Sequence, residues 1–238
     1  MLLCVFASAS ASRSQDGGAA VDMTGIGIYA MEDAVKESAR PTKQTRRNPG
    51  AKIGSPSRQQ TARETAILTF TPSLERRRRN LTAFAAKLRA QNPQAKVNIQ
   101  QPIGNGDIIS RLNQELVKVG LKPNNIADAY AAWWLNAWLA SRGRVDTPPR
   151  AQIAAIRAQA VHALLRVPAL ASASDAAKQE LAEDYLVQTA IIGAALEQAK
   201  NNPAQLKAIA ARIRQDAAIR GLNLDALSLT SKGFEKRR

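Results

Sequence analysis

The sequence predicts an all-α fold: a six-helix bundle with a buried central Trp-rich helix, preceded by a disordered tail. Apolar residues recur at helical spacing in six segments, and proline, glycine, serine or asparagine separates them. Alanine and leucine supply most of the apolar content while only 4% of residues are aromatic, a composition that suits closely packed helices. The segment from Ile126 to Ala140 is apolar almost all round, which is typical of a helix buried inside a fold.

Residues 1–11 resemble the end of a secretory signal peptide. An apolar run leads into small residues with Ala-x-Ala spacing at residues 7–9 and 9–11. This pattern predicts export to the periplasm or the exterior. The basic segment that normally precedes such a run is missing, so we expect the signal peptide to be truncated. The alternative is a frayed apolar N-terminus of a cytosolic protein. No later segment approaches the roughly 20 apolar residues that span a bilayer, so we expect no transmembrane helix in the mature chain.

Residues 12–64 are expected to form a disordered, basic tail or linker. They are rich in Ser, Gly, Arg, Gln and Thr, and basic residues far outnumber acidic ones between Lys36 and Arg63. Such a segment buries too little apolar surface to offset the loss of chain entropy on folding. We expect the helical domain to cover residues 65–234 and to open with a short extended run at residues 66–70.

The boundaries of the first two helices are marked by capping residues. The hydroxyl of Thr71, followed by a proline, is expected to cap the first helix, which then runs to about Ala90. Asp107 is expected to cap the second helix. Gly120 is expected to end that helix, with Leu121 making the apolar contact of a Schellman motif.

The later helices are marked in the same way. Their expected starts are Asn125, Thr147–Pro149, Ser172 or Ser174, and Asn202–Pro203. Pro168 is expected to end the fourth helix and Gly221 the sixth. Leucines then alternate with polar residues from residue 222 to 229, as expected of a chain that returns across the surface.

The densest charge run is Arg76, Arg77, Arg78 and Arg79, in the first turns of the first helix. Cations are mildly unfavourable there because that end of the helix dipole is positive. One interpretation is an anion-binding site built from planar guanidinium forks. On the helical wheel Arg77 and Arg78 flank the apolar stripe and the other two point away. The alternative is therefore that these two lay their stems over the core while all four heads reach water or carboxylates, and we favour it because charge runs are usually solvated faces.

Asp128 and Asn136 are polar exceptions on the tryptophan helix. Because buried polar groups need partners, we expect Asp128 to accept from an arginine of another helix and Asn136 to cap the backbone of a connector. The alternative is a small polar pocket for a sugar or peptide beside the stacked tryptophans. We favour the structural roles, since aromatic residues at helical spacing are usually core.

No catalytic residue, metal site or cofactor is predicted. His162, the only histidine, is expected to be exposed on the fourth helix without partners. Glu180 and Asp184 share a face of the fifth helix. A small hydrolase would need such carboxylates to face one deep cleft.

Three segments resemble a family of uncharacterised secreted bacterial α-helical proteins. They are Leu68–Ser73, Asn124–Trp138 and Gly221–Asp225, of which the central one is the most specific. The resemblance covers about residues 65–234 and implies export and a helical fold, with no activity to transfer.

The formal net charge of +15 lies mostly in the predicted domain, which favours an anionic partner or a solvated basic surface. We expect an exported, non-enzymatic interaction or structural module of the cell envelope, with an envelope protein or an anionic polymer as partner. The first alternative is an anion-binding module for nucleic acid or an anionic membrane surface. The second is a small hydrolase.

Overall fold

The fold of this chain is mostly helical in a computed structural model, which describes residues 58–91, 107–219 and 221–237. Helices take up 72% of these residues, which confirms the predicted all-α class. The elements in this part of the chain are α2 (Arg58–Leu68), α3 (Leu74–Gln91), α4 (Ile108–Lys118), α5 (Ile126–Ala140), α6 (Arg150–Leu164), α7 (Pro168–Ala171), α8 (Asp175–Ala199), α9 (Pro203–Ile219), the 3-10 helix η1 (Leu224–Ala226), β1 (Leu227–Thr230) and β2 (Gly233–Lys236). The expected signal peptide and most of the expected tail lie outside the described residues.

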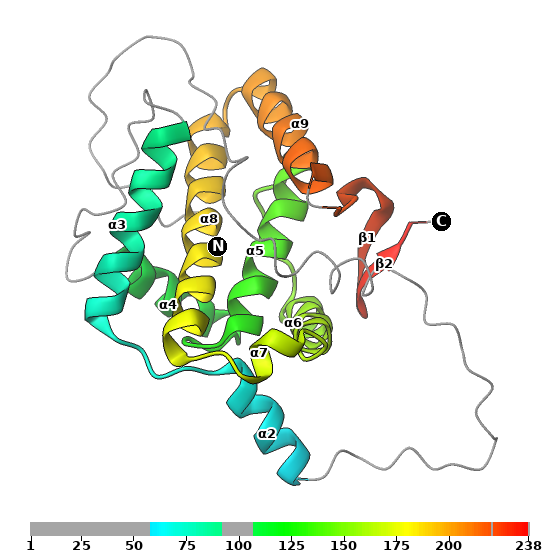
Figure 1. The fold of residues 1–238 in the computed structure, drawn as a ribbon. Helices are drawn as coiled ribbons and strands as arrows, with labels where there is room; N and C mark the ends of the chain where they lie inside the picture. The colour runs from blue at the N-terminus through cyan, green and yellow to red at the C-terminus, as the bar shows by residue number, and fades with distance from the viewer. Residues whose placement is uncertain (1–57, 92–106, 220, 238) are drawn as a thin grey trace, which may run out of the picture.

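Helix α5 is the centre of the bundle, as predicted. No residue along it exposes more than 6% of its surface. It packs against α8, α6 and α9, while α3 and α4 pack on α8 (Figure 1). Since its neighbours cover it on several sides, only a sequence that is apolar almost all round can fill this position.

An aromatic cluster fills the middle of the core. Tyr130 stacks on Trp133 and Trp134, each with ring centroids 5.8 Å apart, and Tyr185 of α8 lies 5.2 Å from Tyr130. Phe234 of β2 lies 4.6 Å from the Trp134 ring. Large aromatic side chains bury more area than any others, so this cluster joins α5 to α8 and to the end of the chain.

Several capping residues have the roles that the sequence predicts. The side chain of Asp107 accepts a hydrogen bond from a backbone N–H of α4, and the side chains of Asn125 and Ser174 do the same for α5 and α8. Gly120 has φ +86°, and the Leu121 N–H donates back to α4 at 2.9 Å, which completes the Schellman motif.

The chain becomes helical earlier than expected. Helix α2 begins at Arg58, inside the segment predicted to be disordered, and covers part of the run predicted to be extended. The buried ammonium group of Lys178 donates to the carbonyls of Ala66 at 3.1 Å and Thr69 at 3.4 Å, at the C-terminal end of α2. A cation from a distant helix therefore binds the free carbonyls of this helix end, which no local pattern reveals.

The start of α3 also differs from the prediction. Ser73 caps the helix, because its hydroxyl accepts from the Arg76 N–H at 3.3 Å. The expected cap, Thr71, is exposed, and its backbone N–H donates to Asp175 of α8 at 3.0 Å instead. Tertiary binding of the preceding segment thus moves the helix start by two positions.

The C-terminal segment is part of the core, whereas the sequence predicted that the chain would return across the surface. β1 and β2 form an antiparallel hairpin, and Phe234 is 5% exposed. The amide of Gln159 on α6 donates to the Phe234 carbonyl and accepts from its N–H, both at 2.8 Å. Gly233 has φ +95°, and a side chain there would collide with Gln159. The fourth predicted helix is α6, which ends at Leu164, and Pro168 begins the short α7.

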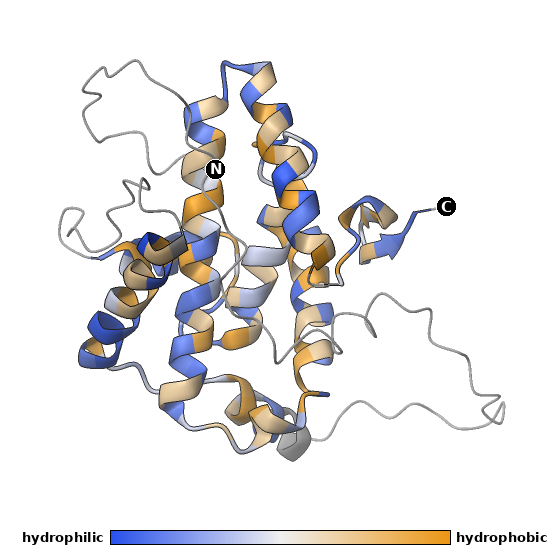
Figure 2. Cartoon of the chain, turned by 45° about the horizontal axis from the view of Figure 1, so that its top comes forward, coloured by the Kyte–Doolittle hydropathy of each residue, from blue (hydrophilic) through white to orange (hydrophobic). Residues whose placement is uncertain are grey.

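The outer helices are amphipathic. Hydrophilic and hydrophobic residues alternate along them in Figure 2, and the N-terminal end of α3 is strongly hydrophilic. Among the described residues, no helix combines the length and hydropathy that crossing a bilayer requires.

Candidate functional site

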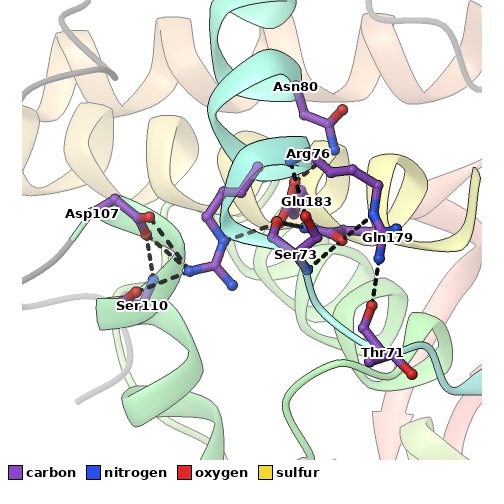
Figure 3. Close-up of polar contacts among 9 residues, drawn as sticks. Thr71, Ser73, Arg76, Asn80, Asp107, Ser110, Gln179 and Glu183 are labelled. Carbon is purple, nitrogen blue, oxygen red and sulfur yellow. Dashed lines mark hydrogen bonds and ion pairs between the residues drawn. The ribbon is translucent and has the colours of Figure 1, made fainter. Parts of the chain in front are cut away.

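A polar network joins the start of α3 to α4 and α8 (Figure 3). We call it the α3–α8 network. It consists of Thr71, Ser73, Arg76, Arg77, Asn80, Asp107, Ser110, Gln179 and Glu183. It contains the largest set of linked charged and amide side chains in the described part of the chain, so it is the first candidate for a functional site.

Arg77 and Glu183 form the centre of the α3–α8 network. They are 7% and 3% exposed, and the Arg77 Nε lies 3.0 Å from Oε1 of Glu183. A terminal nitrogen of Arg77 donates to the hydroxyl of Ser110 at 3.0 Å and lies 3.4 Å from the carboxylate of Asp107. One guanidinium therefore links three helices, since its partners lie on α8 and at the start of α4.

The buried carboxylate of Glu183 accepts hydrogen bonds from three side chains. Its Oε1 accepts from Arg77 and from the Gln179 amide at 2.8 Å, and its Oε2 accepts from Asn80 at 2.7 Å. Since Arg77 and Asn80 lie on α3, these hydrogen bonds join Glu183 of α8 to α3.

Gln179 connects the centre of the network to the start of α3. It is fully buried, and its Oε1 accepts from the Ser73 N–H and from Arg76 Nε, both at 3.0 Å. Its amide nitrogen donates to the Ser73 carbonyl at 2.8 Å as well as to Glu183. Because both the oxygen and the nitrogen of the Gln179 amide are hydrogen-bonded, this side chain fixes the backbone that enters α3.

The structure separates the four consecutive arginines. Arg77 is buried, and Arg76 is half-buried against α8, where it also donates to the Thr71 carbonyl at 2.6 Å. Arg78 and Arg79 are exposed, and Arg79 pairs with Glu75. Arg77 covers the core as expected, but the wheel positions of Arg76 and Arg78 were wrong: Arg76 faces α8 and Arg78 faces solvent. The four heads do not converge on one site.

Asp128 has the partner that the sequence predicts. It is 0% exposed, and its Oδ1 accepts from Arg157 Nε of α6 at 2.7 Å and from the Lys122 N–H at 2.9 Å. Asn136 does not cap a connector. Its amide donates to the carbonyl of Ala132 in the same helix at 2.8 Å, because a short amide in a helix interior reaches the carbonyl four residues back.

The tryptophans offer no open stacking surface. Trp133, Trp134 and Trp138 are 6%, 1% and 5% exposed. The Trp138 indole N–H donates to the Leu227 carbonyl at 3.1 Å. Burial also raises the pKa of Tyr130. The rings and their polar edges face the interior of the bundle, in agreement with the core interpretation.

Glu180 and Asp184 line a groove between α3 and α8, together with Glu183, Asn80 and Lys87. Its volume is about 320 Å³, which includes space open to solvent. Glu180 is exposed, and Asp184 accepts a hydrogen bond from an amide on the next turn of α8 at 2.8 Å. The two carboxylates thus share an open groove instead of the deep cleft that the hydrolase interpretation requires.

No metal centre is found in the part of the chain that the structure describes. His162 is exposed there, as predicted, and no three His, Cys, Asp or Glu side chains are grouped as metal ligands would be.

Sequence reasoning missed the role of Glu183 and Gln179. Of the acidic residues early in α8, only Glu180 and Asp184 were considered as a pair that could carry chemistry. One signal was present: Gln179 and Glu183 are four residues apart, and Glu183 is four before Val187, so all three lie on one face of α8. The spacing places Gln179 and Glu183 on the same face as an apolar residue, but it does not reveal their partners.

The sequence was compared with protein families, with curated proteins and with solved structures. The family model described as "Family of unknown function (DUF6683)" matches residues 12–237. The match extends across residues 12–64, which the resemblance noted above left outside. The comparisons with curated proteins and with solved structures each returned no match. Since the family model covers nearly all of the sequence, the chain belongs to this family of unknown function, DUF6683.

Proposed function

We propose that this protein is an exported, non-enzymatic helical module of the cell envelope that binds a partner through its folded surface. The observation that carries the proposal is that the buried Glu183 accepts hydrogen bonds from three side chains, Arg77, Gln179 and Asn80. In the α3–α8 network, the polar side chains hydrogen-bond mainly to one another and to the backbone that enters α3. Such a network makes the packing of α3, α4 and α8 more rigid and leaves its polar groups engaged within the protein.

The surface that this support presents is basic. We call the exposed cations of α3 the α3 basic face: Arg78, Arg79, Lys87 and Arg89. Arg79 pairs with Glu75 of the same helix, and Lys87 also lines the groove that contains Glu180, Glu183 and Asp184. The exposed side chains between the cations are small, which lets an extended polymer approach the helix; they are Thr82, Ala83 and Ala86. An anionic polymer of the envelope is therefore the partner class that we favour.

Nucleic acid and an anionic membrane remain alternatives for the same face. A membrane partner is less well supported, because Leu74 at the start of α3 is the one large apolar side chain that the described part of this helix exposes, and alanine and threonine stand between its cations. A duplex would bind through phosphate contacts that weaken steeply with salt.

The α3 basic face can be tested with a triple variant, Arg78→Gln, Lys87→Gln and Arg89→Gln. The matched control removes three exposed cations elsewhere: Arg166→Gln, Lys207→Gln and Lys232→Gln. Binding to heparin, duplex DNA and anionic vesicles would be measured over a range of salt concentrations. We expect the α3 variant to bind heparin at least tenfold more weakly than the control, with a shallower salt dependence.

Equal binding by the two triple variants would refute the α3 basic face as the docking surface. Loss of binding to duplex DNA alone would favour the nucleic-acid alternative. Export has its own test: mass spectrometry of the protein expressed from the full-length gene should show a processed N-terminus, and an intact Met1 would contradict export.

A further inference from the structure

Four arginines from different parts of the chain gather around η1. Arg142 and Arg144 follow α5, Arg214 is on α9, and Arg237 follows β2. The Arg142 guanidinium donates to the first carbonyl of η1 at 3.2 Å, and Arg214 pairs with the η1 carboxylate at 3.2 Å. The backbone N–H of Arg237 donates to the last carbonyl of η1 at 2.7 Å. We call these four residues the η1 arginine cluster.

Arg142 and Arg144 share one aromatic ring. The guanidinium carbon of Arg142 lies 4.3 Å from the centroid of the Trp138 ring, and that of Arg144 lies 5.5 Å away. Arg142 also donates to the Leu227 carbonyl and to the Ser141 hydroxyl, both at 2.9 Å. These contacts fix the plane of the guanidinium through neutral acceptors, so none of them cancels its charge.

The η1 arginine cluster carries an excess of positive charge. Asp146 binds Arg144 at 2.8 Å, and the η1 carboxylate, Asp225, binds Arg214. Four cations set against these two anions leave two positive charges. Burial lowers the pKa of Arg142, and the charges of the other three arginines lower it further, although Asp225 opposes this effect. The other three arginines thus lie close enough to Arg142 for their charges to act on it.

We propose that the η1 arginine cluster binds a phosphate-type dianion. Guanidinium N–H groups match the spacing of phosphoryl oxygens, and Arg142, Arg144 and Arg214 each have more N–H donors than these contacts use. The two excess positive charges match the two negative charges of a phosphate monoester. The site is separate from the α3 basic face and does not depend on the function proposed for it.

The experiment follows the indole N–H signals of the full chain by NMR while inorganic phosphate is added at constant ionic strength. All three tryptophans lie on α5, and Trp138 alone touches the cluster, so we expect its signal to shift while those of Trp133 and Trp134 stay in place. Chloride at the same ionic strength should leave all three unchanged. No shift of the Trp138 signal with millimolar phosphate would overturn the proposal.

Two variants complete the test. Arg237→Gln removes an exposed member of the cluster, and Lys236→Gln removes the adjacent exposed cation. We expect about tenfold weaker phosphate binding for Arg237→Gln and unchanged binding for Lys236→Gln, as fits the loss of one charge-assisted contact. If the two variants bind phosphate with equal affinity, the proposed phosphate site at the η1 arginine cluster is wrong. Tighter binding of glycerol phosphate than of inorganic phosphate would assign the phosphoryl group to a larger molecule, and the reverse would assign it to the free ion.

Discussion

Two arginine–carboxylate pairs, each with a buried carboxylate, connect different helices of the bundle. Arg77 and Glu183 join α3 to α8, and Arg157 and Asp128 join α6 to α5. The pairs differ in exposure, because both members of the first are buried whereas the Arg157 side chain is 31% exposed. A buried pair need not stabilise the fold more than apolar residues would, but the loss of one partner leaves the other without compensation. These pairs therefore specify which helices meet.

Replacement of Asp128 tests this role at the scale of one residue. In Asp128→Ala the Lys122 N–H and the Arg157 guanidinium both lose an acceptor. We expect the free energy of unfolding to fall by about 2 kcal/mol, measured by chemical denaturation. The control is Asp146→Ala, which removes an exposed partner of Arg144 and should cost about 0.5 kcal/mol. Equal losses in the two variants would contradict a buried structural role for Asp128.

At the scale of elements, the segment that enters α3 is held by the start of α8. The Thr71 N–H donates to Asp175, and the Ser73 backbone is bound on both sides by the amide of Gln179. Asp175 also lies in the first turn of α8, where a negative charge suits the helix dipole. The entry to α3 is therefore set by contacts with a helix about 100 residues later.

Asp175 should make this junction sensitive to acid. The hydrogen bonds with Thr71 lower the pKa of Asp175 below its ordinary value of 3.8. Its contribution to stability is therefore present above the pKa of the unfolded chain and is lost as the pH falls through the lower pKa of the folded state. We expect Asp175→Asn to be less stable than the natural sequence at pH 6 and nearly equal at pH 2. Denaturant unfolding measures the two stabilities. If the natural sequence exceeds Asp175→Asn in stability by the same amount at pH 6 and at pH 2, this role of Asp175 is refuted.

At the scale of the whole molecule, the end of the chain closes the core. Phe234 packs on Trp134 and Trp138, and Gln159 of α6 holds its backbone on both sides. The hairpin thus connects the central helix α5 to α6. It also places Arg237 beside η1, so the same packing creates the η1 arginine cluster.

Phe234→Ala tests whether the hairpin is part of the core. We expect the free energy of unfolding to fall by about 3 kcal/mol, since a buried phenylalanine would be replaced by a cavity. Tryptophan emission should shift to longer wavelength because Trp134 and Trp138 lose their cover. The exposed neighbour provides the control: Lys236→Ala should change stability by about 0.5 kcal/mol or less. Unchanged emission in Phe234→Ala would show that the hairpin lies outside the core.

The sequence alone determined the helical class, the central position of α5 and the caps at Asp107, Asn125 and Gly120. These features depend on residues a few positions apart, and a helical period or a capping side chain acts over that range. The sequence also predicted that Asp128 would take an arginine, because a polar group on a buried helix must have a partner.

Only the tertiary structure decided which partners meet. It brought Arg77 to Glu183 across 106 positions, turned Lys178 onto the carbonyls that end α2, and folded the chain end into a hairpin under Trp134. It also separated the four arginines of α3 and gathered another four around η1. Such contacts are set by how packed helices approach one another, so residues close in the sequence can part while distant ones form a single site.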